Sequence, residues 1–453
     1  MWGVNVHRRV ARASAFLALL VVVSVFALLT QPTATGLVRA TVPVGQGPRF
    51  VAIDGLTEHA FVVDQGGVQG ATLTPLPADV AMIDVRSGAL VRTIALNTDP
   101  TGIAVDERHG RAIVIGAAGI VSVLDTATGA LVATPVVVGG TDALGVDTVS
   151  GHAVAASYAA GTASTIDLRT GRLLRVARVG QGAVGVLVDE RTHRAFVESR
   201  PGGYGAGTRG SIGVIDTTSG ALLRRVTVGL SPDGMALSTG ENRVYVLNSQ
   251  DGTVSVLDAR SGALVFTIAL TAGGFPTGPG TLVIDERTHH AFVDHGWIHV
   301  FDTRTGAIVA LHKVSTVQGP LGIDTRTDRV FAATYRDGRV RVLDGASGRI
   351  LRTIDVGIAP QDMTVDEREG RVYIVTPGAV LATAPPGALG PVQTRGPGRV
   401  YVLDARSGAI QGRAVVGMNP VVVTVNAEAG RVLVLNMAGL TRASDPWALL
   451  RVG

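Results

Sequence analysis

One short phrase recurs eight times along this 453-residue chain, and it constrains the possible folds more than any other feature. The phrase consists of an apolar stretch that ends in Asp, two variable residues, Ser or Thr, Gly, and a second apolar stretch. The eight copies begin at Asp84, Asp125, Asp167, Asp216, Asp258, Asp302, Asp344 and Asp404, and they end at Gly88, Gly129, Gly171, Gly220, Gly262, Gly306, Gly348 and Gly408. The Asp can accept hydrogen bonds from backbone N–H groups two and three residues later, and the Gly supplies the positive φ of a tight turn. Each copy therefore predicts a β-hairpin.

A second type of hairpin lies between consecutive copies, as at residues 102–114 and 234–247. Its first strand is short and rich in Gly and Ala, which suits a crowded position near a central axis. Most copies are introduced by a proline, namely Pro48, Pro100, Pro232, Pro279, Pro320, Pro360 and Pro420. Four strands in each ~40-residue period, without helical patterning, are typical of propeller blades. The sequence therefore predicts an all-β propeller built from four-stranded blades.

The number of blades follows from the strand count, with the strands of each blade named A to D from the axis outward. Eight complete repeats span about residues 48–96, 100–139, 141–179, 182–228, 232–270, 279–314, 320–356 and 360–416. Residues 37–45 match a lone D strand, and residues 420–436 match a lone AB hairpin. Pairing these two segments in a composite last blade would close the ring and remove its free edges. We therefore expect a propeller over residues 36–436, closed by an N-terminal strand, with about nine blades and with eight as the alternative.

The two ends of the chain depart from the repeat. After residue 436 the phrase is absent, so the composite blade is expected to lack a C strand and residues 437–453 to form an irregular tail.

At the other end, Arg8, Arg9 and Arg12 precede an uncharged apolar run over residues 13–29, which predicts a hydrophobic helix and indicates an export segment within residues 1–35. A helix of that length, about 25 Å, is compatible with a cleaved signal and with a retained membrane anchor. In both cases the propeller is predicted to be extracytoplasmic, with membrane contact through residues 13–29 if they are retained.

Composition excludes several classes of chemistry. The chain has no cysteine, which rules out disulfides, iron–sulfur clusters, thiolate-bound zinc and thiol catalysis. The net charge of +4 comes almost wholly from arginine, because Lys313 is the only lysine. These arginines are spread over the predicted outer strands, and aromatic residues make up only 4% of the chain, whereas nucleic-acid surfaces combine clustered charge with stacking rings. We therefore expect no nucleic-acid partner.

Two neighbouring segments carry a resemblance to a known family. Residues 244–248 read VYVLN, and residues 251–258 read DGTVSVLD, followed by Ser261 and Gly262. This stretch resembles the YVTN-type β-propeller repeat of YncE-like proteins, with Leu247 in place of the Thr of the motif, and the resemblance extends over nearly all of residues 36–436. It implies an exported propeller from a family whose members mostly lack an assigned reaction, although some relatives of similar fold are lactonases.

The long insertions all fall on one face of the predicted ring. Successive strands alternate in direction, so BC and DA loops share one face, and the insertions are the BC loops at residues 64–79, 200–210 and 376–398 and the DA loop at residues 271–280. Insertions on one face of a repeat protein often mark its binding surface, although tolerated loop drift is an alternative. The candidate binding residues on this face are Asp64, Gln65, Arg200, Tyr204, Arg209 and Tyr335.

Histidines and acidic turns offer only weak metal-binding candidates. His59, His109, His193 and His289 occupy similar AB turns on different blades, so they are not expected to converge on one ion. The only local cluster is Asp294, His295 and His299 around one BC turn, and the alternative is that these are solvent-exposed turn residues. The Asp-Glu-Arg turns that begin at Asp106, Asp189, Asp285 and Asp366 are interpreted as solvated AB turns with local ion pairs.

These observations favour a binding protein over an enzyme. We found no catalytic constellation and no cofactor motif, so the leading hypothesis is an exported, non-enzymatic binding or scaffold module whose partner is a protein or a cell-envelope component. The alternative is a metal-dependent lactonase-type hydrolase that holds a divalent ion at the mouth of the central channel. Asp64 and Asn248, at the ends of two B strands, are possible ligands under that alternative.

Overall fold

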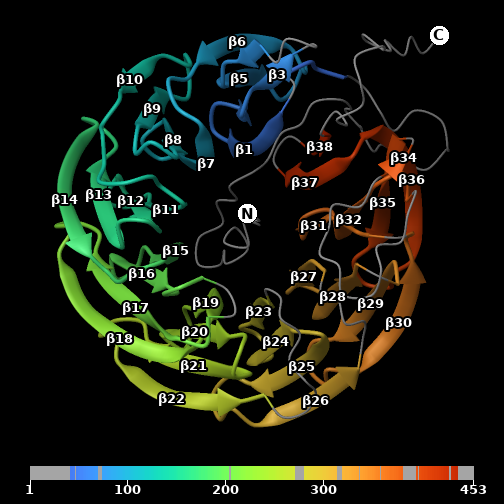
Figure 1. Ribbon diagram of the computed structural model, residues 1–453. Helices are drawn as coiled ribbons and strands as arrows, with labels where there is room; N and C mark the ends of the chain where they lie inside the picture. The colour runs from blue at the N-terminus through green and yellow to red at the C-terminus, as the bar shows by residue number, and fades with distance from the viewer. Residues whose placement is uncertain are drawn as a thin grey trace, which may run out of the picture.

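Eight four-stranded antiparallel sheets stand in a ring around a central axis, as Figure 1 shows. The computed structural model describes residues 41–45, 47–69, 74–203, 206–270, 280–313, 319–335, 337–357, 359–380, 394–395, 397–427 and 430–436. We number the eight sheets as blades 1 to 8 in chain order. Each blade has its first strand near the axis and its last strand at the rim, so the predicted all-β propeller of four-stranded blades is confirmed.

The strands of the first four blades follow one another along the chain, apart from a short hairpin inserted in blade 1. Blade 1 contains β1 (Pro48–Asp54), β2 (His59–Asp64), β5 (Asp79–Asp84) and β6 (Leu90–Ala95), and blade 2 contains β7 (Pro100–Asp106), β8 (Arg111–Gly116), β9 (Val121–Asp125) and β10 (Leu131–Ala133). Blade 3 contains β11 (Ala143–Asp147), β12 (His152–Ser157), β13 (Thr162–Asp167) and β14 (Arg172–Arg178), and blade 4 contains β15 (Ala183–Asp189), β16 (Arg194–Ser199), β17 (Arg209–Asp216) and β18 (Leu222–Leu230).

The second half of the ring repeats this arrangement, with a short hairpin inserted in blade 8. Blade 5 contains β19 (Pro232–Ser238), β20 (Arg243–Asn248), β21 (Thr253–Asp258) and β22 (Leu264–Ala269), and blade 6 contains β23 (Thr281–Asp285), β24 (His290–Asp294), β25 (Trp297–Asp302) and β26 (Ile308–Lys313). Blade 7 contains β27 (Leu321–Asp324), β28 (Arg329–Thr334), β29 (Arg339–Asp344) and β30 (Ile350–Asp355), and blade 8 contains β31 (Asp362–Asp366), β32 (Arg371–Thr376), β35 (Pro397–Asp404) and β36 (Ile410–Met418).

A two-stranded sheet occupies a ninth position between blades 8 and 1. It consists of β37 (Pro420–Asn426) and β38 (Arg431–Asn436), and its apolar side chains share one cluster with both neighbouring blades. Val42 and Val44 of the N-terminal segment are buried in the same cluster, although the described residues 41–45 carry no strand. The ring therefore has eight complete blades and a ninth, two-stranded position. Of the D strand predicted at residues 37–45, the described residues 41–45 form no strand and residues 37–40 lie outside the described residues, so the pairing of a composite blade stays a prediction.

The hydrophobic core is divided among the junctions between blades. In the junction of blades 1 and 2, Phe61 and Met82 of the first blade pack in one cluster with Ile103 and Val114 of the second. The other clusters join neighbouring blades in the same way around the ring. The largest joins blade 8, the ninth sheet and blade 1. Each blade therefore buries its two faces against its neighbours.

The recurrent Asp phrase forms the CD turn of every blade, as predicted. In blade 4 the Asp216 carboxylate accepts the backbone N–H groups of Thr218 and Ser219 at 3.1 and 2.9 Å, and Gly220 has a φ of 68°. Partial burial works against the charged form, yet the hydrogen bonds from Thr218 and Ser219 outweigh it and lower the pKa of Asp216 to about 2. The pKa of the corresponding Asp is lowered in all eight copies. The recurrent phrase therefore serves to form and stabilise the CD turns.

The Asp-Glu-Arg turns bind neighbouring blades together, which corrects the expectation of solvated turns. One expected local ion pair is present, between Arg191 and Asp189 at 3.2 Å. The turns lie on blades 2, 4, 6 and 8, and the Asp of each turn is buried. The Glu that follows accepts a backbone N–H from the preceding blade in the pairs Glu107–Gly55, Glu190–Thr148, Glu286–Thr239 and Glu367–Thr325. Three of the arginines reach the following position of the ring in the pairs Arg191–Asn242, Arg287–Asp328 and Arg368–Ala427. These turns therefore connect their blade to both sides.

The predicted export segment, with its hydrophobic helix and possible membrane anchor at residues 13–29, lies outside the described residues, as does the C-terminal tail at residues 437–453. In the part of the chain that the structure describes, no helix has the length and hydropathy needed to cross a membrane. Retention and cleavage of the segment both stay predictions.

Removal of a CD-turn carboxylate is expected to destabilise the ring in a pH-dependent way. The pKa of Asp216 in the folded chain lies below that of an unfolded Asp, so its contribution is present above pH 4 and is lost as the pH falls toward 2. We expect Asp216→Ala to lower the free energy of unfolding by about 1 kcal/mol at pH 7 and by less near pH 3, measured by urea unfolding. The exposed Asp99 supplies the control variant Asp99→Ala. Equal losses at both pH values for Asp216→Ala would contradict this account.

Candidate functional site

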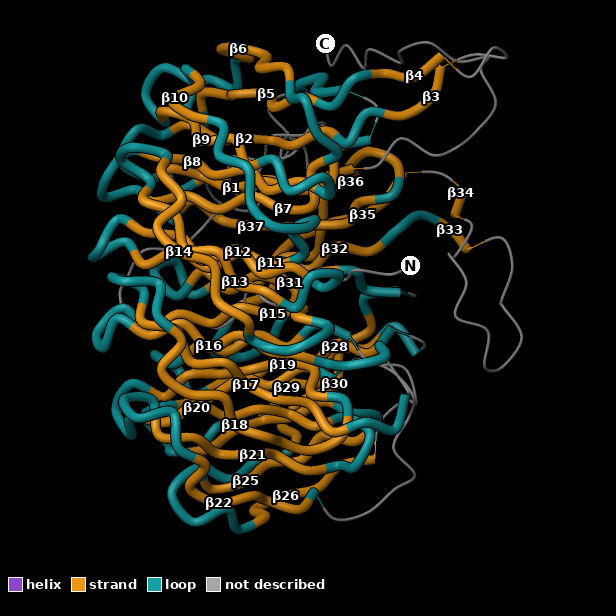
Figure 2. The backbone as a smooth tube through the Cα atoms, turned by 60° about the vertical axis from the view of Figure 1, so that its left-hand side comes forward, coloured by secondary structure: helices purple, strands orange, loops and turns teal. Residues whose placement is uncertain are grey.

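The face that carries the BC and DA loops is the candidate functional surface. Two extra hairpins project from it, β3 (Gly67–Gln69) with β4 (Thr74–Leu76) from blade 1 and β33 (Ala379–Val380) with β34 (Thr394–Arg395) from blade 8. Figure 2 shows both on the same side of the ring, whereas the opposite side carries only short turns. The predicted concentration of insertions on one face is therefore visible in the structure for these two BC loops. Most of the DA insertion, at residues 271–279, lies outside the described residues.

Asp64 lies at the base of the blade 1 hairpin and is buried. Its carboxylate oxygens accept the backbone N–H of Gly47 at 3.1 Å, and its Oδ1 accepts that of Gly66 at 2.6 Å. Asp79 is directly opposite Asp64 in the pairing of β2 with β5. Burial, together with the neighbouring Asp64 charge, raises the pKa of Asp79 to about 6. The neighbouring Gln65 donates its Nε2–H to the Pro100 carbonyl at 2.7 Å, so this site connects blade 1 to blade 2.

Arg200 belongs to a polar network that runs across blades 4, 5 and 6. Its Nη1 lies 3.1 Å from Asp233 Oδ1, and Asp233 Oδ2 accepts the Gly280 N–H at 3.2 Å. The neighbouring Glu198 is fully buried and accepts the Gly234 N–H at 3.1 Å, and burial raises its pKa. Sequence reasoning missed Glu198 and Asp233, although an acidic residue within an otherwise apolar strand is a signal that was available in β16.

The remaining binding candidates are spread around the face. Arg209 is exposed and donates to the Val228 carbonyl at 3.3 Å within blade 4. Tyr335 is half-buried in blade 7, its carbonyl accepts the Ala359 N–H at 2.8 Å, and burial raises the pKa of its phenol. Tyr204 lies outside the described residues. The structure therefore brings Asp64 and Gln65 together, but it places them, Arg200, Arg209 and Tyr335 on three separate sectors rather than in one pocket.

The structure does not bring Asp294, His295 and His299 together as a metal site. His299 is directly opposite Val293 and Asp294 is directly opposite Ile298, so these two side chains point to opposite faces of the blade. His299 lies toward blade 5 and Asp294 toward blade 7. Across the described residues, no three His, Asp or Glu side chains are grouped so that they could hold a metal ion.

These three side chains are also buried, whereas the alternative interpretation expected solvent-exposed turn residues. The alternation of β25 was the available signal, because His299 shares its side of the strand with Phe301. Burial raises the pKa of Asp294 to about 7, against the opposing effects of the Gly296 and Gly319 N–H groups and of Arg341.

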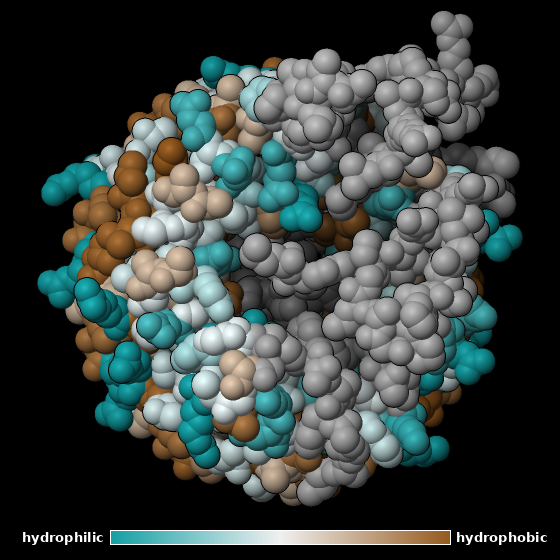
Figure 3. All heavy atoms as spheres, in the orientation of Figure 1, coloured by the Kyte–Doolittle hydropathy of each residue, from teal (hydrophilic) through white to brown (hydrophobic). Residues whose placement is uncertain are grey.

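The described part of the loop face is mostly of intermediate hydropathy, with scattered hydrophilic residues, as Figure 3 shows. In Figure 3, which views this face, hydrophobic residues gather along the outer rim over β10, β14 and β18. The exposed aliphatic residues there are Leu131, Val132, Leu173, Leu174, Leu222 and Leu223. The face itself therefore offers hydrogen-bonding and charged groups to a partner.

Comparison with known proteins places the chain in a family. A family model described as outer membrane protein assembly factor BamB matches residues 208–438, which is just over half of the chain. The chain belongs to this family. The BamB match supports a β-propeller repeat protein, whereas the narrower YncE-like assignment has no support from it and stays a prediction. No curated protein sequence matches the chain.

Several solved structures share the fold. BamB from Moraxella catarrhalis is 19% identical, with 72% of this chain and 93% of that chain covered and a TM-score of 0.50. NirN, a dihydro-heme d1 dehydrogenase in complex with DHE, is 15% identical, with 85% and 78% covered and a TM-score of 0.55. Sqt1 from Saccharomyces cerevisiae is 13% identical, with 73% and 93% covered and a TM-score of 0.52. At these identities the likeness shows the propeller fold alone.

Asp294 is expected to make stability fall as the pH rises. Its pKa is about 7 in the folded chain and about 4 in an unfolded one, so the folded state keeps a proton that the unfolded state releases. The protonated form stabilises the fold at pH 5, and this advantage is lost as the pH rises through 7. We expect Asp294→Asn, which keeps the Oδ1 acceptor, to raise the free energy of unfolding at pH 8 by up to a few kcal/mol and to change it little at pH 5.

The measurement is urea unfolding of the unmodified protein and of Asp294→Asn at pH 5 and at pH 8. Asp216→Asn is the matched control, because the pKa of Asp216 is lowered and loss of its charge brings no gain at pH 8. Destabilisation of Asp294→Asn at pH 8 would show that the buried carboxylate is needed in its charged form.

Proposed function

We propose that this chain is an exported, non-enzymatic scaffold propeller that binds a protein of the cell envelope through its BC and DA loop face. The observation that carries this proposal is the projection of the β3–β4 and β33–β34 hairpins from a single face of the ring. The description of the matching family as an outer membrane protein assembly factor supports a protein partner. No observation in the described residues favours the lactonase alternative.

The two hairpins define one sector of the face. Blades 1 and 8 lie on either side of the ninth sheet, so the hairpins flank the closure of the ring. An isolated two-stranded hairpin is only marginally stable in water, which suits an element that is completed by a partner. The described part of the face has no large hydrophobic patch away from the rim, and interfaces that are no more apolar than the rest of the surface are typical of partners that also exist apart. We therefore place the partner across blades 8 and 1.

The pairing register allows both hairpins to be replaced while their flanking strands stay paired, at the cost of the Gln65 bond to the Pro100 carbonyl and of the first two residues of β35. Asp64 is directly opposite Asp79, and Thr376 is directly opposite Arg399, so a two-residue Asn-Gly turn can replace residues 65–78 or residues 377–398. We expect each replacement to lower recovery of the envelope partner at least tenfold in a quantitative crosslinking pull-down. The double replacement is expected to abolish recovery.

The control carries Arg260→Glu in the CD turn of blade 5, an exposed residue on the opposite face, and it should recover the partner as well as the unmodified chain does. Thermal unfolding of all variants checks that the ring is intact. Full recovery by the folded double replacement would refute the proposed face.

A further inference from the structure

The outer strands of blades 2, 3 and 4 expose a continuous apolar stripe. Its members are Leu131, Val132, Val136 and Val138 of blade 2, Leu173 and Leu174 of blade 3, and Leu222 and Leu223 of blade 4, and all are exposed. A Cβ added at Gly171 would collide with Ala133, and one added at Gly220 would collide with Arg175, so each CD turn packs directly against the outer strand of the preceding blade. The three outer strands therefore form one surface, as Figure 1 and Figure 3 show.

Arginine is concentrated on the same surface. The exposed arginines are Arg172, Arg175 and Arg178 of blade 3 and Arg224 and Arg225 of blade 4. The strands β10, β14 and β18 contain no acidic residue. None of the other five outer strands, β6, β22, β26, β30 and β36, has more than one Arg or Lys. Exposed aliphatic residues recur around the ring, whereas the gathering of positive charge is specific to blades 3 and 4. We call residues 131–138, 172–178 and 222–227 the basic rim.

The arginines of the basic rim have no internal role in the described structure. Arg92 of blade 1 occupies the strand position of Arg175 and Arg224, and its Nη1 donates to the Thr128 carbonyl in the next CD turn at 3.3 Å. Among the described residues, by contrast, the guanidinium groups of the basic rim have no hydrogen-bond acceptor or ion-pair partner. Their charge is therefore open to groups from outside the chain.

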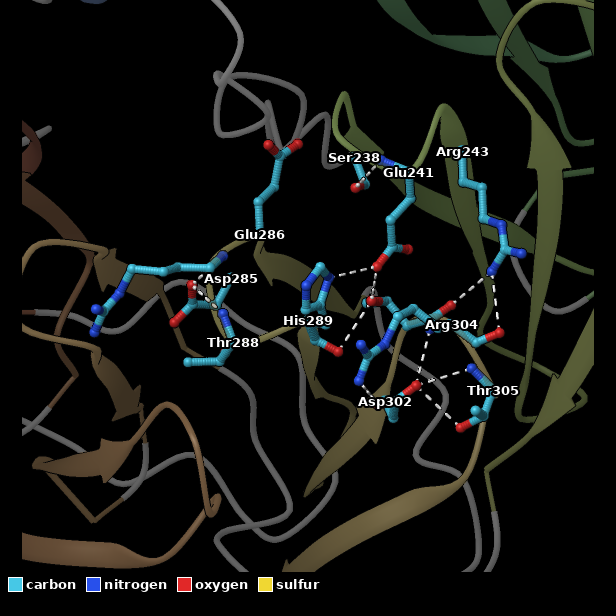
Figure 4. Close-up of polar contacts among 12 residues, drawn as sticks. Ser238, Glu241, Arg243, Asp285, Glu286, Thr288, His289, Asp302, Arg304 and Thr305 are labelled. Atoms are coloured by element: carbon cyan, nitrogen blue, oxygen red, sulfur yellow. Dashed lines mark hydrogen bonds and ion pairs between the residues drawn. The ribbon is translucent and has the colours of Figure 1, made fainter.

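Arginines of the AB and CD turns also have partners within the ring. In Figure 4, Arg243 donates to the carbonyls of Thr303 and Arg304 at 2.9 and 3.3 Å, and Arg304 bonds the Asp302 carboxylate at 3.0 Å. These contacts hold a turn or join two blades. The basic rim thus differs from the turns in leaving several neighbouring arginines to the solvent.

Addition of a partner's strand to the basic rim is disfavoured. Unpaired edge strands such as β14 and β18 can bind a strand of another protein. However, a β-bulge interrupts the pairing between Thr165 and Ile166 and between Val214 and Ile215, next to the exposed leucine pairs. Bulges and charged side chains are the means by which edge strands avoid such pairing. The side chains of the basic rim, rather than its backbone, are therefore suited to make the contact.

We propose that the basic rim binds the surface of a membrane that contains anionic phospholipid. Its arginines pair with lipid phosphates, and its leucine and valine side chains enter the boundary between headgroups and acyl chains. Open strand edges are not stable in the hydrocarbon, so the contact stays at the depth of this boundary. The basic rim lies on the outer edge of the ring and not on the loop face, so the proposal is independent of the function proposed above.

The test uses the full chain with one fluorescent reporter at a time, because the sequence contains no cysteine. Thr227→Cys places an environment-sensitive label on the basic rim, and Thr353→Cys places the same label on the outer strand of blade 7; both threonines are exposed. The vesicles contain phosphatidylcholine alone or with about one third phosphatidylglycerol. Both proteins carry residues 13–29, so attachment through that predicted segment is common to the two.

We expect the anionic vesicles to shift the emission of the label at residue 227 to the blue. Lipids brominated near the top of the acyl chain should quench this label about fivefold more than the label at residue 353, and high salt should reduce the difference by screening. Vesicles of phosphatidylcholine alone should give little response. Equal quenching of both labels, or no response to the anionic vesicles, overturns the proposal.

Charge reversal supplies the matched comparison. Arg224→Glu with Arg225→Glu should reduce quenching at residue 227 to the level seen at residue 353. Arg349→Glu with Arg413→Glu changes the net charge equally at exposed positions of blades 7 and 8, and it should leave that quenching unchanged. Thermal unfolding checks that both variants are folded.

Replacement of the leucines tests the apolar part of the contact. Leu174→Ser with Leu223→Ser should lower quenching at residue 227, whereas Val309→Ser with Leu351→Ser, at similarly exposed positions of blades 6 and 7, should not. Full quenching in the folded Arg224→Glu with Arg225→Glu variant refutes the proposal. A label at residue 227 that responds to polyglutamate but not to anionic vesicles also refutes it, because the partner would then be an acidic polypeptide.

Discussion

The packing of each blade against the next supports the rest of this propeller. Every hydrophobic cluster of the described residues lies between neighbouring blades, and no cluster is confined to one sheet. A four-stranded sheet with two apolar faces cannot be stable alone in water, so each blade depends on both neighbours. The ring therefore has to close, because an open ring would expose one apolar face at each end. This requirement explains why the closure holds the largest cluster.

The blades could be predicted from the sequence because their turns are stabilised by hydrogen bonds between residues that are close in the chain. The contacts between blades join residues that are far apart in the chain, so the sequence did not reveal them. The turn at Asp216 could be predicted because its hydrogen-bond partners lie within three residues. Glu286 bonds Thr239, which lies 47 residues away, so nothing near Glu286 in the sequence reveals the partner. The burial of His299 was available from strand alternation, whereas its neighbours from blade 5 were not. Contacts within a hairpin can therefore be inferred from spacing, and contacts between blades require the ring.

On the candidate surface, too, the sequence predicted the local features but not the contacts between blades. The sequence located the loop face correctly, because strand direction alternates and the lengths of the insertions can be measured directly. It did not reveal that Arg200 bonds Asp233 of the next blade, or that Gln65 bonds the Pro100 carbonyl of blade 2. Several side chains chosen as ligand contacts thus join blades to one another. Projection of the two hairpins, rather than any single residue, is therefore the feature on which the proposed partner surface rests.

The AB turns reveal a constraint on how the ring closes. The even-numbered blades carry the Asp-Glu-Arg turns, and the turns of the odd-numbered positions accept their hydrogen bonds. The ring has nine positions, an odd number, so two accepting turns are neighbours where blade 1 follows the ninth sheet. Gly55 in blade 1 already bonds Glu107 of blade 2, and Asn426 in the ninth sheet stands where the even blades carry the Asp of the Asp-Glu-Arg turn.

The described contacts at this junction include one hydrogen bond and an apolar cluster. Arg431 donates to the Arg86 carbonyl at 3.5 Å, and Val42 and Val44 of the N-terminal segment are buried among the side chains of the ninth sheet and its neighbours. Apolar burial is non-directional, so it can join the two ends of the ring wherever apolar side chains meet. Among the described residues, the closure thus differs from the other junctions in drawing in residues from before the first blade.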